Sequence, residues 1–146
     1  MKLKYKENIL YKIAGSVYIL LSLMYLGVMY FLFKDKQIYF NRFIIFIFSF
    51  IPLNFVVGAY YFKLHTIDYV RLNDNELSIY KSLILPRKKL NISEIEQGRI
   101  IGEKLILILK NGKEVAISFK LLTITDSENL LIKLKEFFLI EQAFVK

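Results

Sequence analysis

Cysteine and tryptophan are absent from this 146-residue chain, and histidine occurs once, as His65. Without cysteine the chain can form neither a disulfide framework nor a thiolate metal site. A lone histidine with no second histidine or cysteine makes a poor metal site, so we interpret His65 as an inert residue. We therefore expect no metal and no cofactor.

The sequence also lacks the motifs of common catalytic sites. It contains no glycine-rich phosphate loop, no nucleophile elbow and no Ser/His/Asp set, and Gly98 and Gly102 are isolated glycines. Glu94 and Glu96 lie two residues apart, but a general acid/base pair needs a cleft and polar partners, and a solvated turn explains them better. We predict that the protein is not an enzyme.

Positive charge is in excess and is concentrated in the first part of the chain. The net charge is +8, of which residues 1–62 carry +5 (7 basic, 2 acidic) and the remainder +3 (14 basic, 11 acidic). No cluster of basic and aromatic residues marks a helix of the second part, which argues against a nucleic-acid partner. The charge instead favours anionic lipid of the inner leaflet as a partner.

Two long uncharged runs dominate the first part, residues 13–33 (21 residues) and residues 43–62 (20 residues). A helix of about 20 apolar residues crosses a hydrocarbon core roughly 30 Å thick. The first run is too long for the apolar region of a signal peptide, and no small-residue cleavage site follows it. We predict a transmembrane helical hairpin over residues 13–62, with residues 34–42 as its link.

The distribution of cations predicts the orientation of this hairpin. Seven cations lie before the first run or soon after the second, and three lie in the link. Because cytoplasmic flanks carry the excess of lysine and arginine, we expect a multi-pass protein of the cell membrane with both termini cytoplasmic. Residues 1–12 form a basic arm in which Lys2, Lys4 and Lys6 act as a topology signal or contact anionic headgroups.

Polar and small residues inside the two runs predict how the helices pack. Small residues such as Ser22 and Gly58 let a neighbouring helix come close. Pro52 frees a backbone carbonyl, and the Asn54 amide needs a partner in hydrocarbon. Asn54 is predicted either to bond within the hairpin, to Ser22 or Tyr25, or to contact another subunit or membrane protein.

From residue 64 the pattern changes to the alternation of strands, and we assign residues 63–146 to one cytoplasmic domain. Asn73-Asp74-Asn75 and Asn111-Gly112 are turn signals between paired strands. A helix capped by Thr125 or Asp126 follows, with apolar residues at helical spacing. The expected strands are residues 66–72, 76–82, 87–91, 104–110 and 113–118, with a turn or short strand at residues 92–98.

Antiparallel hairpins closed by one amphipathic C-terminal helix resemble the pleckstrin-homology-like fold, an α+β architecture. Three places carry the resemblance: Leu77-Ser78-Ile79-Tyr80, Ile92-Ser93-Glu94-Ile95, and the Asn111-Gly112 hairpin before the helix. Their order, after a membrane hairpin, is similar to the bacterial pleckstrin-homology domain family of small membrane proteins. One departure is the apolar stretch Leu83-Ile84-Leu85-Pro86, which could contact lipid or a partner.

Small proteins of this layout resemble, among others, immunity proteins encoded beside leaderless bacteriocins, and the composition would suit a low-GC Gram-positive source. The resemblance implies self-protection against a cationic, membrane-active peptide. The alternative is a membrane-anchored interaction module that assembles another membrane protein or binds anionic lipid. Arg87, Lys88 and Lys89 are the candidate recognition patch, unless these cations only solvate an edge strand.

Overall fold

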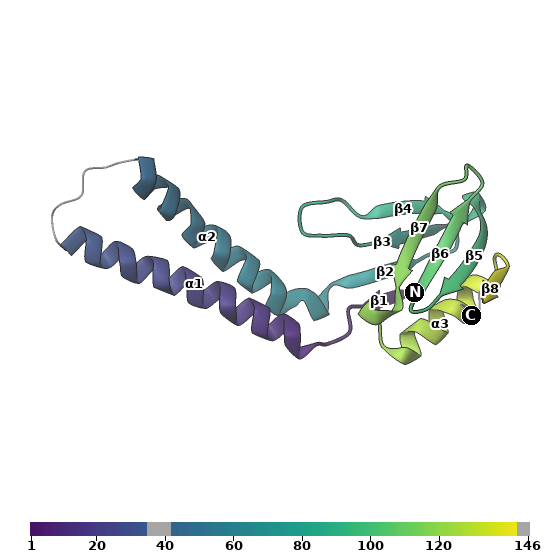
Figure 1. Ribbon diagram of the computed structural model, residues 1–146. Coiled ribbons are helices and arrows are strands. Elements are labelled where there is room, and N and C mark those ends of the chain that lie inside the picture. The colour runs from purple at the N-terminus through teal and green to yellow at the C-terminus, as the bar shows by residue number, and fades with distance from the viewer. Residues whose placement is uncertain (35–41, 143–146) are drawn as a thin grey trace. The chain divides into compact units, whose positions relative to one another are not determined.

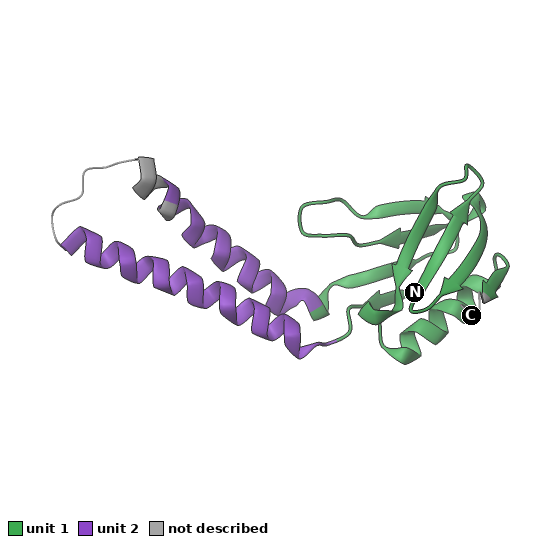
Figure 2. Ribbon diagram, viewed as in Figure 1, with its two compact units in different colours: residues 1–6, 65–146 green, residues 7–64 purple. Residues whose placement is uncertain are grey.

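The computed structural model describes residues 1–34 and 42–142, and the chain divides into two compact units. One unit is helical and covers residues 7–64. The other covers residues 1–6 together with residues 65–146 and contains the strands (Figure 2). The protein is therefore α+β, as the sequence predicts.

The helical unit consists of α1 (Ile9–Lys34) and α2 (Arg42–Lys63), which lie side by side (Figure 1). The helices approach each other closely where Gly15 faces Gly58, since a Cβ atom built on Gly58 would lie 3.0 Å from the carbonyl oxygen of Gly15. Further along, the Ser22 hydroxyl donates a hydrogen bond of 3.0 Å to the Ile51 carbonyl. From Gly15 to Ser22 along α1, the facing residue of α2 changes from Gly58 back to Ile51, so the two helices are antiparallel.

The outward faces of this unit are apolar. Exposed leucine, valine and phenylalanine side chains occur along the length of α1. Among the residues that the structure describes, α1 is the one helix with the length and composition of a membrane span. The predicted second span, residues 43–62, lies in α2 and includes positions whose side chains fall outside the described residues; the predicted link falls largely on residues 35–41, also outside them.

The other unit contains two four-stranded sheets. The first has the order β1-β2-β3-β4, with all neighbours antiparallel. The second has the order β7-β6-β5-β8, in which β8 runs parallel to β5. The strands are β1 (Lys2–Lys4), β2 (Asp68–Leu72), β3 (Glu76–Ile79), β4 (Lys88–Asn91), β5 (Ile95–Ile101), β6 (Lys104–Leu109), β7 (Glu114–Ser118) and β8 (Ile140–Gln142).

Both predicted hairpins are confirmed, with shorter strands than expected. β2 and β3 pair across Asn73–Asn75, and β6 and β7 pair across Asn111-Gly112, where Gly112 has a φ of +75°. The predicted turn or short strand at residues 92–98 is a 3-10 turn, Ile92–Glu94, followed by β5. In β6, buried leucines alternate with half-buried isoleucines, so one face of this strand points into the core.

Residues 1–6 differ most from the expectation. Leu3 is buried and lies opposite Val70, and Lys2–Lys4 form an edge strand on β2. The predicted basic arm is therefore divided, since residues 1–6 join the sheet and α1 begins at Ile9. The physical reason is that the lysines alternate with Leu3 and Tyr5, which is the pattern of a strand with one buried face.

Helix α3 (Ile124–Lys135) closes the core of this unit. Leu130 and Leu134 are fully buried, as are Leu77 and Leu105 of the two sheets. The predicted caps are wrong, because Thr123 is the N-cap and its hydroxyl accepts a hydrogen bond of 3.1 Å from the Asp126 amide. Thr125 and Asp126 have cap-forming side chains as well, but both lie in the first turn of α3.

Candidate functional site

Arg87, the first residue of the predicted recognition patch, is turned into the domain. Its guanidinium donates to the Ser78 hydroxyl at 2.9 Å, to the Asp68 carbonyl at 2.7 Å and to the Ser78 carbonyl at 3.2 Å. Burial lowers the pKa of Arg87, and the nearby Arg71 lowers it further. These hydrogen bonds join β2 and β3. The guanidinium that was predicted to bind a ligand is therefore used within the hairpin.

The other two residues of the predicted patch have different surroundings. Lys89 is exposed on β4, and its ammonium lies 3.2 Å from a Glu76 carboxylate oxygen. Lys88 is half-buried, and burial lowers its pKa, with further lowering by Lys81 and Lys113. Two other cations thus act on Lys88, and none of the ion pairs among the described residues includes it.

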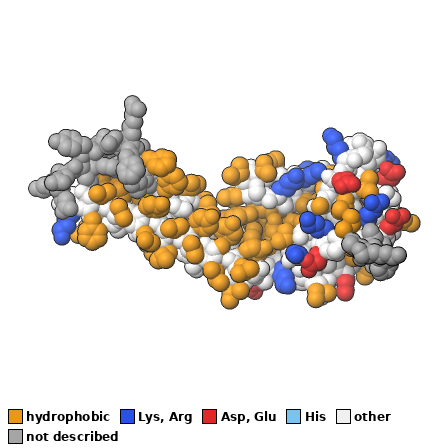
Figure 3. Space-filling view, viewed as in Figure 1, with side chains coloured by type: hydrophobic (Ala, Val, Ile, Leu, Met, Phe, Trp, Pro, Cys, Tyr) orange, Lys and Arg blue, Asp and Glu red, His pale blue; other side chains and the backbone are white. Residues whose placement is uncertain are grey.

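The connection between β3 and β4 carries three consecutive exposed apolar side chains, which we call the apolar tip. It consists of Leu83, Ile84 and Leu85, with exposed fractions of 51%, 91% and 55%. The Leu85 amide donates to the Ser82 hydroxyl at 3.1 Å, which fixes the turn. Figure 3 shows hydrophobic side chains gathered at this end of the hairpin, with basic side chains beside them.

Next to the apolar tip is a cavity of about 380 Å³ with aromatic walls. The rings of Tyr5 and Tyr69 lie 4.9 Å apart, and those of Tyr5 and Tyr80 lie 6.1 Å apart in an edge-to-face arrangement. Arg87 lies 5.8 Å from the centre of the Tyr80 ring. The residues that line the cavity include three tyrosines, two lysines and a residue of the tip, namely Tyr5, Tyr69, Tyr80, Lys81, Lys88 and Leu85.

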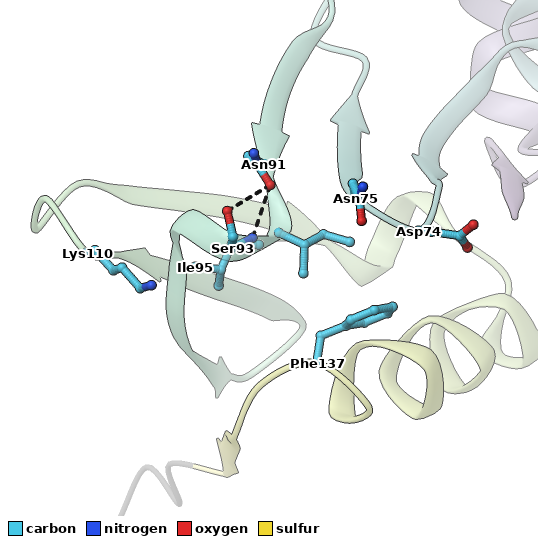
Figure 4. Close-up of a pocket in the computed structure, with 8 residues that line it drawn as sticks. Asp74, Asn75, Asn91, Ser93, Ile95, Lys110 and Phe137 are labelled. Atoms are coloured by element: carbon cyan, nitrogen blue, oxygen red, sulfur yellow. Dashed lines mark hydrogen bonds between the residues drawn. The ribbon is translucent and has the colours of Figure 1, made fainter.

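A second cavity, of about 640 Å³, lies at the Asn73–Asn75 turn and is shown in Figure 4. Asp74 and Lys110 bring opposite charges to its wall, and Phe137 closes one side. The side-chain oxygen of Asn91 caps the local turn, because it accepts hydrogen bonds from the backbone amide and the hydroxyl of Ser93. The described residues contain no group of three histidine, cysteine or acidic side chains that could hold a metal.

The lysines of the predicted arm lie on the edge strand β1 or just after it. Lys2, Lys4 and Lys6 are exposed, while Leu3 and Tyr5 between them are buried. The Lys6 backbone amide donates a hydrogen bond of 2.7 Å to the Leu121 carbonyl. The backbone of these three lysines therefore lies along, or just beyond, one edge of the first sheet.

Of the predicted packing residues, Ser22 and Gly58 lie between the helices as expected, whereas Asn54 bonds differently. The Asn54 amide donates to the Phe50 carbonyl of its own helix at 2.9 Å, so neither predicted pair, with Ser22 or with Tyr25, is formed. Ser22 provides the bond between helices, and buried Gly58 provides the close approach. Pro52 is exposed inside α2. A carbonyl one turn back was the nearest acceptor for Asn54, which explains the difference.

The sequence reasoning missed the tyrosine cluster and two lysines, Lys81 and Lys113. Tyr5 comes before α1 and Tyr69 after α2, so no local pattern joins them. The sequence signal for the position of Tyr5 is its alternation with Lys4 and Lys6, which predicts a buried ring on one face of a strand. Comparison with known proteins adds no assignment, because the chain matches no family model, no curated protein and no solved structure.

Proposed function

We propose that the chain is a non-enzymatic, two-pass protein of the cell membrane. The observation that carries this proposal is the pairing of β1 with β2, in which Lys2 lies opposite Arg71 and Leu3 opposite Val70. β1 precedes α1, and β2 follows α2, so both flanks of the helical pair belong to one folded unit. If α1 crosses a bilayer, the chain must return before β2, and α2 is the segment that can do so.

The cations support a cytoplasmic location for this folded unit. Lys2, Lys4 and Lys6 precede α1, Lys63 ends α2 and Arg71 follows it, which places an excess of positive charge on the side that holds the strands. An anionic inner leaflet attracts such a surface. Both termini are therefore proposed to lie in the cytoplasm.

We propose a pleckstrin-homology-like fold for the unit of strands. Two sheets made mostly of antiparallel neighbours, followed by a helix that buries Leu130 and Leu134, support this proposal. The unit departs from the expected layout in two ways. Its first strand is separated from the second by the helical pair, and β8 adds a parallel strand after α3.

Within this architecture, the proposed role is self-protection against a cationic, membrane-active bacteriocin. A membrane-anchored protein with a net charge of +8 presents like charge to such a peptide at the surface that the peptide attacks. The alternative role, an interaction module that binds anionic lipid or assembles another membrane protein, is favoured by the apolar tip. Neither role requires chemistry.

Expression of the full chain in a bacteriocin-sensitive strain tests the proposed role. We expect the lowest inhibitory concentration of a leaderless cationic bacteriocin to rise several-fold, because the protein changes the surface that the peptide meets. The Gly58→Ile variant should protect less, and Gly27→Ile should protect as the natural chain does, because a Cβ at Gly27 meets no atom within 4 Å.

Unchanged sensitivity to every such peptide tested, with the chain present in the membrane fraction, would reject the immunity role. Recovery of a stoichiometric membrane partner under those conditions would instead favour the interaction module. Membrane fractionation is measured in the same cells, so that loss of protection is separated from loss of the protein.

A further inference from the structure

The apolar tip has a composition that suits a bilayer better than water. Three consecutive large apolar side chains project from the turn, and Ile84 has the greatest exposed fraction among the exposed large hydrophobic residues. Singly exposed apolar residues are ordinary, but a contiguous exposed group indicates a surface that is covered by a membrane or a partner. The question is which of these occupies it.

The base of the tip is held firmly. Arg87 bonds to Ser78 on one strand and to Asp68 at the start of another, as described above. Pairing of Ile79 with Lys88 brings the two ends of the connection together. The tip is therefore presented by a braced hairpin, which reduces the conformational entropy that binding would cost.

The charges around the tip identify the occupant. Lys81 is exposed beside it, Lys88 is half-buried at its base, and Lys113 is near enough to affect Lys88. None of the ion pairs formed among the described residues includes these three lysines. A surface that combines apolar side chains with unneutralised cations complements the acyl region and the phosphates of an anionic bilayer.

The tyrosines below the tip agree with this occupant. Tyr80 immediately follows β3, and Lys88 and Leu85 line the same aromatic-walled cavity. Tyrosine rings are enriched where a membrane meets water, since they have an apolar body and a polar end. A second copy of this surface is disfavoured, because it would oppose Lys81, Lys88 and Lys113 with cations of the same sign.

We propose that Leu83, Ile84 and Leu85 insert into the acyl region of an anionic bilayer, with Lys81 and Lys88 at the level of the lipid phosphates. This inference rests on the proposed membrane attachment of the chain and not on the immunity role. It gives the apolar stretch at residues 83–85, which departs from the expected polar turn, a specific role as a lipid-binding site.

Because the chain has no cysteine, single labels can be placed without background. Full-length Ile84→Cys, carrying an environment-sensitive fluorophore, is reconstituted into vesicles of phosphatidylglycerol and phosphatidylcholine or of phosphatidylcholine alone. Quenching by a nitroxide on the lipid chains is compared with quenching by aqueous iodide. Ile132→Cys, an exposed isoleucine of α3, is the matched control, and Leu20→Cys in α1 reports the anchoring.

We expect strong lipid quenching and weak aqueous quenching at position 84 in the anionic vesicles, and the reverse at position 132. Reversal of both lysines, Lys81→Glu with Lys88→Glu, should lower the inserted fraction by about tenfold or more. Circular dichroism of each variant checks that the unit remains folded, and Leu83→Cys provides a second label on the tip.

Aqueous quenching at positions 83 and 84 while position 20 stays protected would overturn the insertion without affecting the proposed anchoring. Aqueous quenching at position 20 would instead reject the anchoring. Protection of position 84 from both quenchers would assign the tip to a protein contact and would equally overturn this proposal.

Discussion

Replacement of Arg87 by methionine is expected to lower the free energy of unfolding of the unit that contains the strands by about 3 kcal/mol. The guanidinium donates to the Ser78 hydroxyl and to the carbonyl oxygens of Asp68 and Ser78. Methionine fills much of the same volume but donates nothing, so half-buried acceptors would lose their partner. Their desolvation is the main part of the expected cost.

Arg87→Lys tests the effect of the positive charge separately from that of the planar set of N–H donors. Lysine keeps the positive charge, but its single ammonium cannot reach three acceptors that a planar guanidinium bridges. We expect this variant to recover only part of the stability. Lys89→Met is the matched control, because it removes an exposed cation two residues away and one surface ion pair, which is worth about 1 kcal/mol or less.

Amide hydrogen exchange of β2, β3 and β4 in the full chain measures this effect. Faster exchange of these strands in Arg87→Met than in Lys89→Met is the expected result. Equal exchange in the two variants would show that the hydrogen bonds of Arg87 contribute no more than a surface ion pair.

Substitution of Gly58 by isoleucine is expected to separate α1 from α2. A Cβ at this position would lie 2.8 Å from the Ile19 Cγ1 atom and 3.0 Å from the Gly15 carbonyl oxygen. Neither helix can accommodate a branched side chain there without moving apart, and the Ser22 to Ile51 hydrogen bond would lengthen. Overpacking of this kind costs about 1 to 3 kcal/mol.

Gly27→Ile is the control for the same chemical change. A Cβ on Gly27 meets nothing within 4 Å, so the substitution should be neutral or should stabilise α1 by removing a helical glycine. Thermal unfolding of the helices, followed by circular dichroism in detergent micelles, is the measurement. We expect a lower midpoint for Gly58→Ile alone, and equal midpoints would contradict the close approach.

The confirmed hairpins show what the sequence could predict. Asn111-Gly112 requires only its own neighbours to specify a turn, and the continuous apolar run of residues 105–109 between two lysines indicates a short buried strand beside it. These signals act over a few residues. They survive in the folded protein because tertiary contacts do not compete with them.

β1 could not be predicted as part of the sheet because its partner is far away in the sequence. Lys2 pairs with Arg71, and the helical pair lies between them in the chain. A short basic stretch before an apolar run also has a simpler interpretation as a topology signal. β8 was missed for a related reason, since three residues after a helix carry too little pattern to predict parallel pairing.

The candidate site was partly visible in the sequence. The exposed apolar stretch at residues 83–85 stood out because it interrupts a polar connection. The role of Arg87 did not, because a run of three cations has the same appearance whether its side chains bind lipid or brace a hairpin. Only the positions of the Asp68 carbonyl and the Ser78 hydroxyl distinguish these roles.

Cysteine labelling in intact cells tests the two-pass arrangement most directly. A membrane-impermeant maleimide is applied to cells that carry Lys34→Cys, at the end of α1, or Ile132→Cys, in α3. We predict that position 34 is labelled from outside and that position 132 is labelled only after the membrane is permeabilised. Labelling of both positions from the same side would contradict the proposal that the chain crosses the membrane and returns before β2.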